Sequence, residues 1–144
     1  MMNSFYLVLF CALKWLCFIN AQDQRNELIN SLLKNYSKSI SPHDTVYVIL
    51  GISLFKIIQL DEIKEIMQSS AYLTVYLNDN RLKWDENEYN NITHIDLPYS
   101  LLWKPDLNII NSADSSGYIK VSETTLARIY RWGWVFVNIE LPSN

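Results

Sequence analysis

Two stretches of the chain place apolar residues with a period of two, and this pattern limits the available folds more than any other feature. They cover residues 46–54 and 72–84. Successive side chains of a β-strand point to opposite faces of a sheet, so this period predicts two strands, each with a buried face. In the first stretch the predicted inner face carries Val46, Val48, Leu50, Ile52 and Leu54, and the other face carries Tyr47, Ile49, Gly51 and Ser53.

The rest of the pattern predicts one helix followed by several short strands. Residues 23–39 place their apolar side chains on one helical stripe, and Ser41-Pro42 ends that helix. We therefore expect a mainly β fold, an immunoglobulin-like antiparallel β-sandwich with an N-terminal α-helix. The further strand-like pieces, separated by turn residues, lie at 92–97, 107–110, 118–121 and 125–138.

The N-terminal segment has the character of an export signal. Its apolar residues lie between Phe5 and Ile19, are interrupted by Lys14, and are fewer than the about 20 that a transmembrane helix needs. Ala21 is a small residue suited to signal cleavage. We predict a signal peptide over residues 1–21 and a domain over 22–144. A retained anchor or a buried hydrophobic element are the alternatives.

The composition argues against several classes of function. The net charge of −3 differs from the basic surface of most nucleic-acid-binding proteins. His43 and His94 lie far apart in the sequence and form no metal-ligand motif. We also find no nucleophile–base arrangement, phosphate-binding loop or paired-carboxylate motif in the sequence. We therefore expect no nucleic-acid binding, no metal, no cofactor and no enzymatic activity.

Three short motifs follow one another along the chain. Asp79-x-Arg81-Leu82-x-Trp84 is followed by Trp103-Lys-Pro105-Asp106 and then by Asn111-Ser-Ala-Asp114. Each motif is weak by itself, but their order and spacing are specific. With them, residues 24 to roughly 137 resemble the extracellular ligand-binding domain of the Cys-loop, or pentameric neurotransmitter-gated, ion channels, and most closely the nicotinic acetylcholine receptor branch.

The resemblance implies a function as well as a fold. It implies a channel subunit in which a small neurotransmitter-like ligand binds at a subunit interface and gates ion flow. It also implies a pentamer with other receptor subunits, no cofactor, and passage through the secretory pathway to the extracellular face of the plasma membrane. In the family, the helices that cross the membrane lie downstream of the segment that this chain resembles.

The resemblance covers only the first half or so of the family's extracellular domain. The family's namesake disulfide, its later strands and its four membrane helices follow the part that residues 133–137 match. We therefore expect residues 22–144 to form a truncated sandwich, a partial ligand-binding domain, from either a fragment of a longer subunit or a short relative. The alternative function is a secreted β-sandwich binding protein or decoy without channel activity.

The positions that match the family's ligand-contacting aromatics carry aliphatic residues here. Leu77 stands where the family's complementary face has a tryptophan, and Ile110 where its principal face has a tyrosine. Tyr76 is a poor substitute, because alternation points it to the opposite face. Cation–π contacts with such rings attract quaternary ammonium ligands. We therefore expect no measurable acetylcholine binding by this chain alone.

The motif residues themselves are expected to be structural. Trp84 and Trp103 are predicted core aromatics, and Asp79 and Arg81 are predicted to form ion pairs with neighbouring strands. Of the remaining motif residues, which include Asn111, Pro105 is predicted to fix a turn, Asp106 to accept backbone hydrogen bonds and Asp114 to order its own turn.

Two sites match the acceptor pattern for N-glycosylation. They are Asn35-Tyr-Ser37, which flanks the apolar stripe of the predicted helix, and Asn91-Ile-Thr93, which follows a polar loop. We therefore consider Asn91 the stronger candidate.

Overall fold

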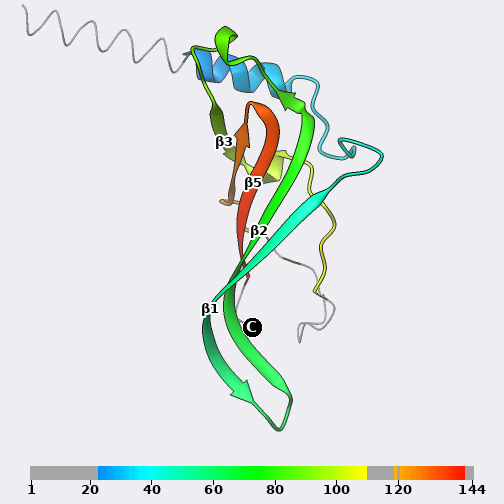
Figure 1. Ribbon diagram of the computed structural model, residues 1–144, viewed down its shortest axis with the longest axis vertical. Helices are drawn as coiled ribbons and strands as arrows, with labels where there is room; N and C mark the ends of the chain where they lie inside the picture. The colour runs from blue at the N-terminus through cyan, green and yellow to red at the C-terminus, as the bar shows by residue number, and fades with distance from the viewer. Residues whose placement is uncertain (1–22, 110–118, 120, 142–144) are drawn as a thin grey trace, which may run out of the picture.

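A computed structural model describes residues 23–109, 119 and 121–141 of the protein. The elements after the N-terminal helix are β1 (Val48–Asp61), β2 (Ile66–Lys83), η1 (Glu86–Glu88), β3 (His94–Pro98), η2 (Tyr99–Leu101), β4 (Leu126–Tyr130) and β5 (Trp132–Leu141). The strands form one antiparallel sheet in the order β1-β2-β5-β4-β3 (Figure 1). The prediction of a mainly β fold with an N-terminal helix is confirmed. A single sheet with one covered face is what a truncated sandwich would show.

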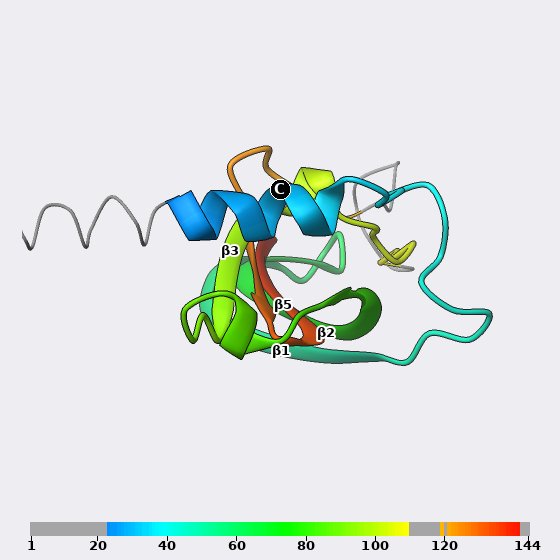
Figure 2. The same cartoon turned by 90° about the horizontal axis from the view of Figure 1, so that it is seen from above.

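The N-terminal helix covers residues 23–33 in the described part of the chain and lies across one end of the sheet (Figure 2). It buries Leu28 completely and packs Ile29, Leu32 and Leu33 against the core. The predicted helix was longer, to residue 39. The helix ends earlier because asparagine and serine residues with lower helix propensity follow it, and because the Tyr36 hydroxyl is engaged elsewhere. None of the described helices is long and apolar enough to span a bilayer.

The strands β1 and β2 form a hairpin that is longer than the alternation predicted. Asp61 pairs with Ile66, and the turn between them includes Glu65 with a φ of 55°. The Asp61 carboxylate accepts a hydrogen bond from the Lys64 backbone N–H at 3.1 Å, which stabilises this turn. As a result, the apolar run at 57–60 and the residues before 72 extend the two predicted strands.

The predicted single strand at 125–138 is instead a hairpin of two strands, β4 and β5. Ala127 pairs with Val137, and the chain reverses at Arg131 and Trp132. The Arg131 backbone N–H donates to the Thr93 carbonyl at 3.0 Å, which holds the reversal against the start of β3. The predicted strands at 107–110 and 118–121 lie partly outside the described residues, and their described residues are irregular apart from an isolated bridge at residue 108.

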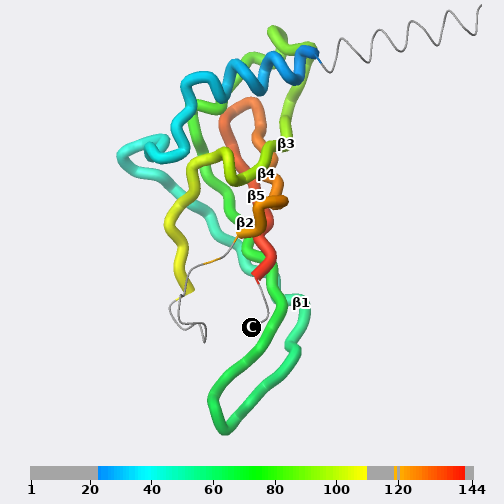
Figure 3. Tube along the Cα trace, turned by 180° about the vertical axis from the view of Figure 1, so that it is seen from behind, coloured from blue at the N-terminus to red at the C-terminus, as the bar shows by residue number. Residues whose placement is uncertain are grey.

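The hydrophobic core lies on one face of the sheet, under the helix and the segment that follows η2. The alternation predicted for β2 is confirmed, because every second side chain from Ala71 to Leu77 is buried. The segment after η2 runs beside the sheet (Figure 3). Its Trp103 and Leu107 side chains pack against this core. The buried side chains that form this core cluster are Leu28, Leu73, Val75, Leu77, Leu82, Ile95, Leu97, Tyr99, Leu102, Ala127, Ile129, Val135, Val137 and Ile139.

The far part of the β1–β2 hairpin, residues 52–70, extends away from the body of the domain as a two-stranded ribbon (Figure 1). Among the described residues, β5 stops pairing with β2 at Ala71, so β1 is the only neighbour beyond that point. Ile52 is 72% exposed and Ile57 is 58% exposed. The predicted inner face of the first stretch is therefore covered only at its start: Val46 and Val48 pack against the core, whereas Leu50, Ile52 and Leu54 are exposed because the described residues place no second layer over them.

This ribbon predicts self-association of residues 22–144 in solution. A long exposed edge strand with apolar side chains on both faces is a template for pairing with another chain. We expect higher oligomers or precipitation in size-exclusion chromatography with light scattering. The double variant Ile52→Lys, Ile57→Lys should shift the population toward monomer, because added charge opposes edge pairing and neither side chain lies in the core.

The matched control is Thr45→Lys, which adds a lysine at an exposed position outside the ribbon. It should leave the association unchanged. A wild-type domain that elutes as a monodisperse monomer with one cooperative unfolding transition would contradict the prediction.

Candidate functional site

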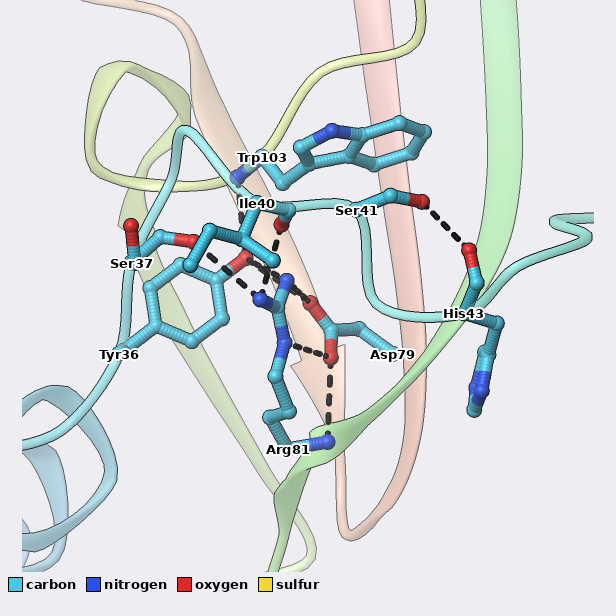
Figure 4. A network of polar contacts seen from close by, with 8 residues as sticks. All are labelled: Tyr36, Ser37, Ile40, Ser41, His43, Asp79, Arg81 and Trp103. Carbon is cyan, nitrogen blue, oxygen red and sulfur yellow. Dashed lines mark hydrogen bonds and ion pairs between the residues drawn. The ribbon is translucent and has the colours of Figure 1, made fainter.

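A buried carboxylate, Asp79, lies at the centre of a polar network beside the segment that follows the N-terminal helix (Figure 4). Asp79 is 1% exposed and is the one charged side chain classed as buried among the described residues. Its Oδ1 accepts hydrogen bonds from the Arg81 backbone N–H at 3.0 Å and from Arg81 Nε at 2.9 Å. Its Oδ2 accepts from Arg81 Nη2 at 2.7 Å and from the Tyr36 hydroxyl at 2.9 Å. Each carboxylate oxygen of Asp79 thus accepts two hydrogen bonds.

The Arg81 guanidinium connects this carboxylate to the chain that follows the helix. Arg81 Nη1 donates to the backbone carbonyls of Ser37 at 3.2 Å and Ile40 at 2.9 Å. Its Cζ also lies 4.5 Å from the centre of the Tyr36 ring, within cation–π range. Arginine suits this position because its planar fork of donors can bind a carboxylate and two carbonyls together.

The Tyr36 hydroxyl joins three separate parts of the chain. It donates to Asp79 on β2 and accepts from the Trp103 backbone N–H at 2.9 Å. The Trp103 segment is thereby tied to both the helix end and β2. We call Tyr36, Asp79, Arg81 and the Trp103 amide the Asp79 network.

The electrostatics of the Asp79 network favour one set of protonation states. Burial alone would raise the pKa of Asp79, but the hydrogen bonds from Arg81 and Tyr36 outweigh it, so the pKa of this carboxyl is lowered. Burial is the largest cause that raises the pKa of Tyr36 to about 12. The hydrogen bond to Asp79 raises the pKa of Arg81. At neutral pH the network therefore holds an ion pair and a neutral tyrosine.

A bulge in the sheet makes room for this arrangement. Asn78 pairs with Trp134 and Lys83 with Trp132, so residues 79–82 of β2 stand opposite the single residue Gly133 of β5. Gly133 has a φ of +80°, and a Cβ there would lie 2.5 Å from the Asp79 carbonyl oxygen. Only glycine allows this close approach.

The bulge also explains a wrong prediction. Asp79 and Arg81 were expected to pair with neighbouring strands, but they pair with each other. Their side chains share one side of β2, and the bulge leaves only a glycine opposite them, so the adjacent strand offers no partner.

The two motif tryptophans pack beside the core. Trp84 and Trp103 are half-buried against the core. The Trp84 indole Nε1 donates to the Ile92 carbonyl at 2.7 Å, which holds the loop after η1. Both rings therefore lie at the edge of the core, and their role as core aromatics stays a prediction.

The predicted ligand position on β2 faces the interior of the domain. Leu77 is 2% exposed and pairs with Val48 and Val135. The adjacent Tyr76 is 39% exposed, and its ring lies 4.8 Å from that of Phe136 on the opposite face of the sheet. The prediction that these two residues face opposite sides is confirmed, whereas a ligand role for Leu77 stays a prediction. Ile110 lies outside the described residues.

The second motif borders a small cavity. Pro105 and Asp106 line it together with Tyr99 and Lys104, and its volume is about 110 Å³. Ligand sites for drug-sized molecules usually have about 300–1,000 Å³, so this cavity alone is too small for one. Pro105 lies in an irregular segment and not in the predicted turn, because the fixed φ of proline is compatible with extended backbone as well as with a turn. The cavity therefore offers no complete binding site.

Several other expectations have a more limited outcome. Asp106 is exposed, and its predicted hydrogen bonds to the backbone stay a prediction. Asn111 and Asp114 lie outside the described residues. Within the described ranges no group of three or more His, Cys, Asp or Glu side chains could hold a metal ion.

The family description "Neurotransmitter-gated ion-channel ligand binding domain" matches residues 25–143. The chain belongs to this family. It is 33% identical over 116 residues to acetylcholine receptor subunit alpha-1-A of Xenopus laevis, which covers 78% of this chain and 25% of the relative.

Two further relatives of this family agree with that assignment. The neuronal acetylcholine receptor subunit alpha-4 of Gallus gallus is 30% identical over 86% of this chain and 21% of its own length. The acetylcholine receptor subunit alpha-type unc-38 of Caenorhabditis elegans is 32% identical over 84% and 25%. The chain thus spans about a fifth to a quarter of the length of these relatives.

The polar role of the Tyr36 hydroxyl in this neurotransmitter-gated channel domain was not predicted from the sequence. It was assigned to the apolar stripe of the helix, where its ring does pack against the core. Its hydroxyl, however, bonds to groups 43 and 67 residues away. A tyrosine at the end of an amphipathic helix, before a buried Asp-x-Arg, is the signal that would have suggested this link.

Removal of the buried charge should destabilise the domain. Asp79→Asn leaves the Arg81 guanidinium without its counter-ion, and we expect a loss of about 3 kcal/mol in the free energy of unfolding. Tyr36→Phe should cost about 1–3 kcal/mol, because it leaves the Trp103 N–H without its partner and removes one of the two donors to Asp79 Oδ2. Urea denaturation followed by tryptophan fluorescence measures both, in the Ile52→Lys, Ile57→Lys background.

The control is Asp96→Asn. Asp96 also pairs with an arginine, Arg128, at 2.8 and 3.0 Å, but this pair is exposed on the sheet. Exposed pairs contribute little, so its loss should be much smaller. Equal losses for Asp79→Asn and Asp96→Asn would contradict a central role of the Asp79 network.

The lowered pKa of Asp79 also predicts how stability depends on pH. A carboxyl with a lowered folded pKa contributes stability that is fully present above its unfolded value of about 4 and is lost as pH falls through the folded pKa. The free energy of unfolding, measured between neutral pH and pH ~2, should fall below about pH 4. Asp79→Asn should flatten this acid limb more than Asp96→Asn, and an unchanged limb would contradict the assignment.

Proposed function

We propose that this chain forms part of the extracellular ligand-binding domain of a nicotinic-type channel subunit. The observation that carries the proposal is the family match over residues 25–143. The Asp79 network supports it, because it joins two of the three matching motifs, Asp79-x-Arg81 and the Trp103 segment, into one unit.

The proposed partners are other receptor subunits, arranged as a pentamer at the extracellular face of the plasma membrane. A small neurotransmitter-like ligand would bind at an interface between two subunits. Its effect on the channel would follow from a higher affinity for the open than for the closed arrangement, which shifts the population between them. The relatives are named acetylcholine receptor subunits, and this supports the class of receptor.

We propose that β2 of this subunit contributes no aromatic contact to a bound ligand, unlike the aromatic contact that acetylcholine makes at this position in the family. Leu77 is aliphatic and buried, so its position offers no aromatic face to a quaternary ammonium group. A single cation–π contact is worth about 0.5–2 kcal/mol, so the loss of one ring weakens binding by up to roughly thirtyfold.

The proposal predicts assembly with receptor subunits. The full chain, carrying an affinity tag, would be co-expressed in oocytes with the Xenopus laevis alpha-1-A subunit. We expect the alpha-1-A subunit to co-purify with the tagged chain in mild detergent, because homologous subunits share their contact surfaces. Sedimentation should show a complex larger than either chain alone.

Asp79→Asn is expected to reduce this co-purification, because it disturbs the domain, while the exposed-pair variant Asp96→Asn should preserve it. An unrelated secreted protein with the same tag controls for nonspecific capture. A wild-type chain that is exported but never co-purifies with the receptor subunit would contradict the proposed assembly.

A further inference from the structure

The loop after η1 holds an asparagine whose side chain is presented to solvent by a fixed backbone. Asn90 and Asn91 both have positive φ, 50° and 57°, and Asn91 is exposed. The Asn91 backbone N–H donates to the Glu86 carbonyl at 2.8 Å. Asparagine tolerates this left-handed conformation better than most residues. The hydrogen bond that closes the turn uses the Asn91 backbone, and the side-chain amide takes no part in it.

The residues on both sides of Asn91 are anchored to the body of the domain. Ile92 packs against the core, and its carbonyl accepts from the Trp84 indole. The Thr93 carbonyl accepts from the Arg131 N–H at 3.0 Å, while the Thr93 side chain stays exposed. In the part of the chain that the structure describes, no hydrogen bond or ion pair involves the Asn91 side chain. A bulky group on this amide would therefore displace no contact seen there.

We infer that Asn91 is a site of N-linked glycosylation, within the acceptor sequence Asn91-Ile92-Thr93. The donor is a lipid-linked oligosaccharide diphosphate. A bond forms between Asn91 Nδ2 and C1 of the first sugar, the bond between C1 and the diphosphate oxygen breaks, one amide proton leaves, and the lipid diphosphate is released. The inference rests on the proposed passage through the secretory pathway.

The position of the loop gives the glycan a structural consequence. Figure 1 shows η1 beside the N-terminal helix, at the opposite end of the molecule from the tip of the β1–β2 hairpin. The Ser31 and Tyr89 hydroxyls lie 3.3 Å apart, which fixes the loop to the helix. A glycan on Asn91 therefore keeps this end of the domain in solvent and excludes it from a tightly packed contact with another subunit.

The acceptor sequence at Asn35 provides an internal comparison. Asn35 is also exposed, but the next residue is Tyr36, whose hydroxyl belongs to the Asp79 network, and the Ser37 carbonyl accepts from Arg81. Asn35→Gln removes this second acceptor sequence, so that a glycan remaining on that variant can be assigned to the Asn91 loop.

The test uses the full chain synthesised in the presence of endoplasmic-reticulum microsomes. Protease protection reports entry into the lumen, and peptide N-glycosidase treatment of the protected chain reports glycans. We expect a protected chain that loses mass on this treatment, and conversion of Asn91 to aspartate in the released peptide by mass spectrometry. Thr93→Ala should abolish the modification of Asn91, Thr93→Ser should retain it, and Asn35→Gln should leave it unchanged.

A protected chain with unmodified Asn91, or an Asn91 modification that persists in Thr93→Ala, would overturn the site while leaving export intact. A chain that stays accessible to protease would overturn both the site and the proposed secretory route. Neither result would affect the family assignment, because that rests on the match over residues 25–143.

Discussion

The burial of one negative charge is the constraint on which the upper part of this domain depends. An ionised carboxylate that loses its water without new partners costs several kcal/mol, so Asp79 has to be surrounded by donors. Arg81 supplies three of them from the same strand, and Tyr36 supplies the fourth from beyond the helix. Since Tyr36 also accepts from the Trp103 amide, satisfying this charge draws the helix end, β2 and the segment after η2 together.

The second requirement is steric and lies on the neighbouring strand. The bulge that turns Asp79 and Arg81 toward Tyr36 brings the Asp79 carbonyl against Gly133, where no side chain fits. The chain reverses between β4 and β5 at Arg131 and Trp132, directly before this glycine, so the hairpin and the polar network lie next to each other. Charge burial and strand geometry are therefore coupled in this domain of the neurotransmitter-gated channel family.

The two ends of the molecule differ in how their side chains are satisfied. At the helix end, the polar groups of the Asp79 network are paired and the tryptophans are packed. At the other end, the ribbon of residues 52–70 carries exposed apolar residues on both faces, such as Ile57 and Ile58. The alternation of residue types could not predict this exposure. Where both faces of a strand carry apolar residues, as at Ile49, Ile57 and Ile58, the sequence does not indicate which face is covered.

The sequence by itself determined the features that depend on local spacing between residues. The period of two along β2 assigned Leu77 to the interior and Tyr76 to the outside, and the motif spacing indicated the family. Both follow from neighbours within a few residues or from residue order, which a linear pattern records. The same pattern does not fix where strands end: the apolar alternation continues through the turn at Arg131, so it predicts one strand where the structure has two.

Only the tertiary structure decided how distant groups meet. The hydrogen-bond partners in the Asp79 network could not be predicted from the pattern. Tyr36 stands 43 residues before Asp79, and Trp103 stands 67 residues after Tyr36. The exposure of Leu50 and Ile52 depends in the same way on which strands lie opposite them. Burial and hydrogen bonding are properties of the assembled surroundings, so these outcomes become defined only once the strands and the helix have packed.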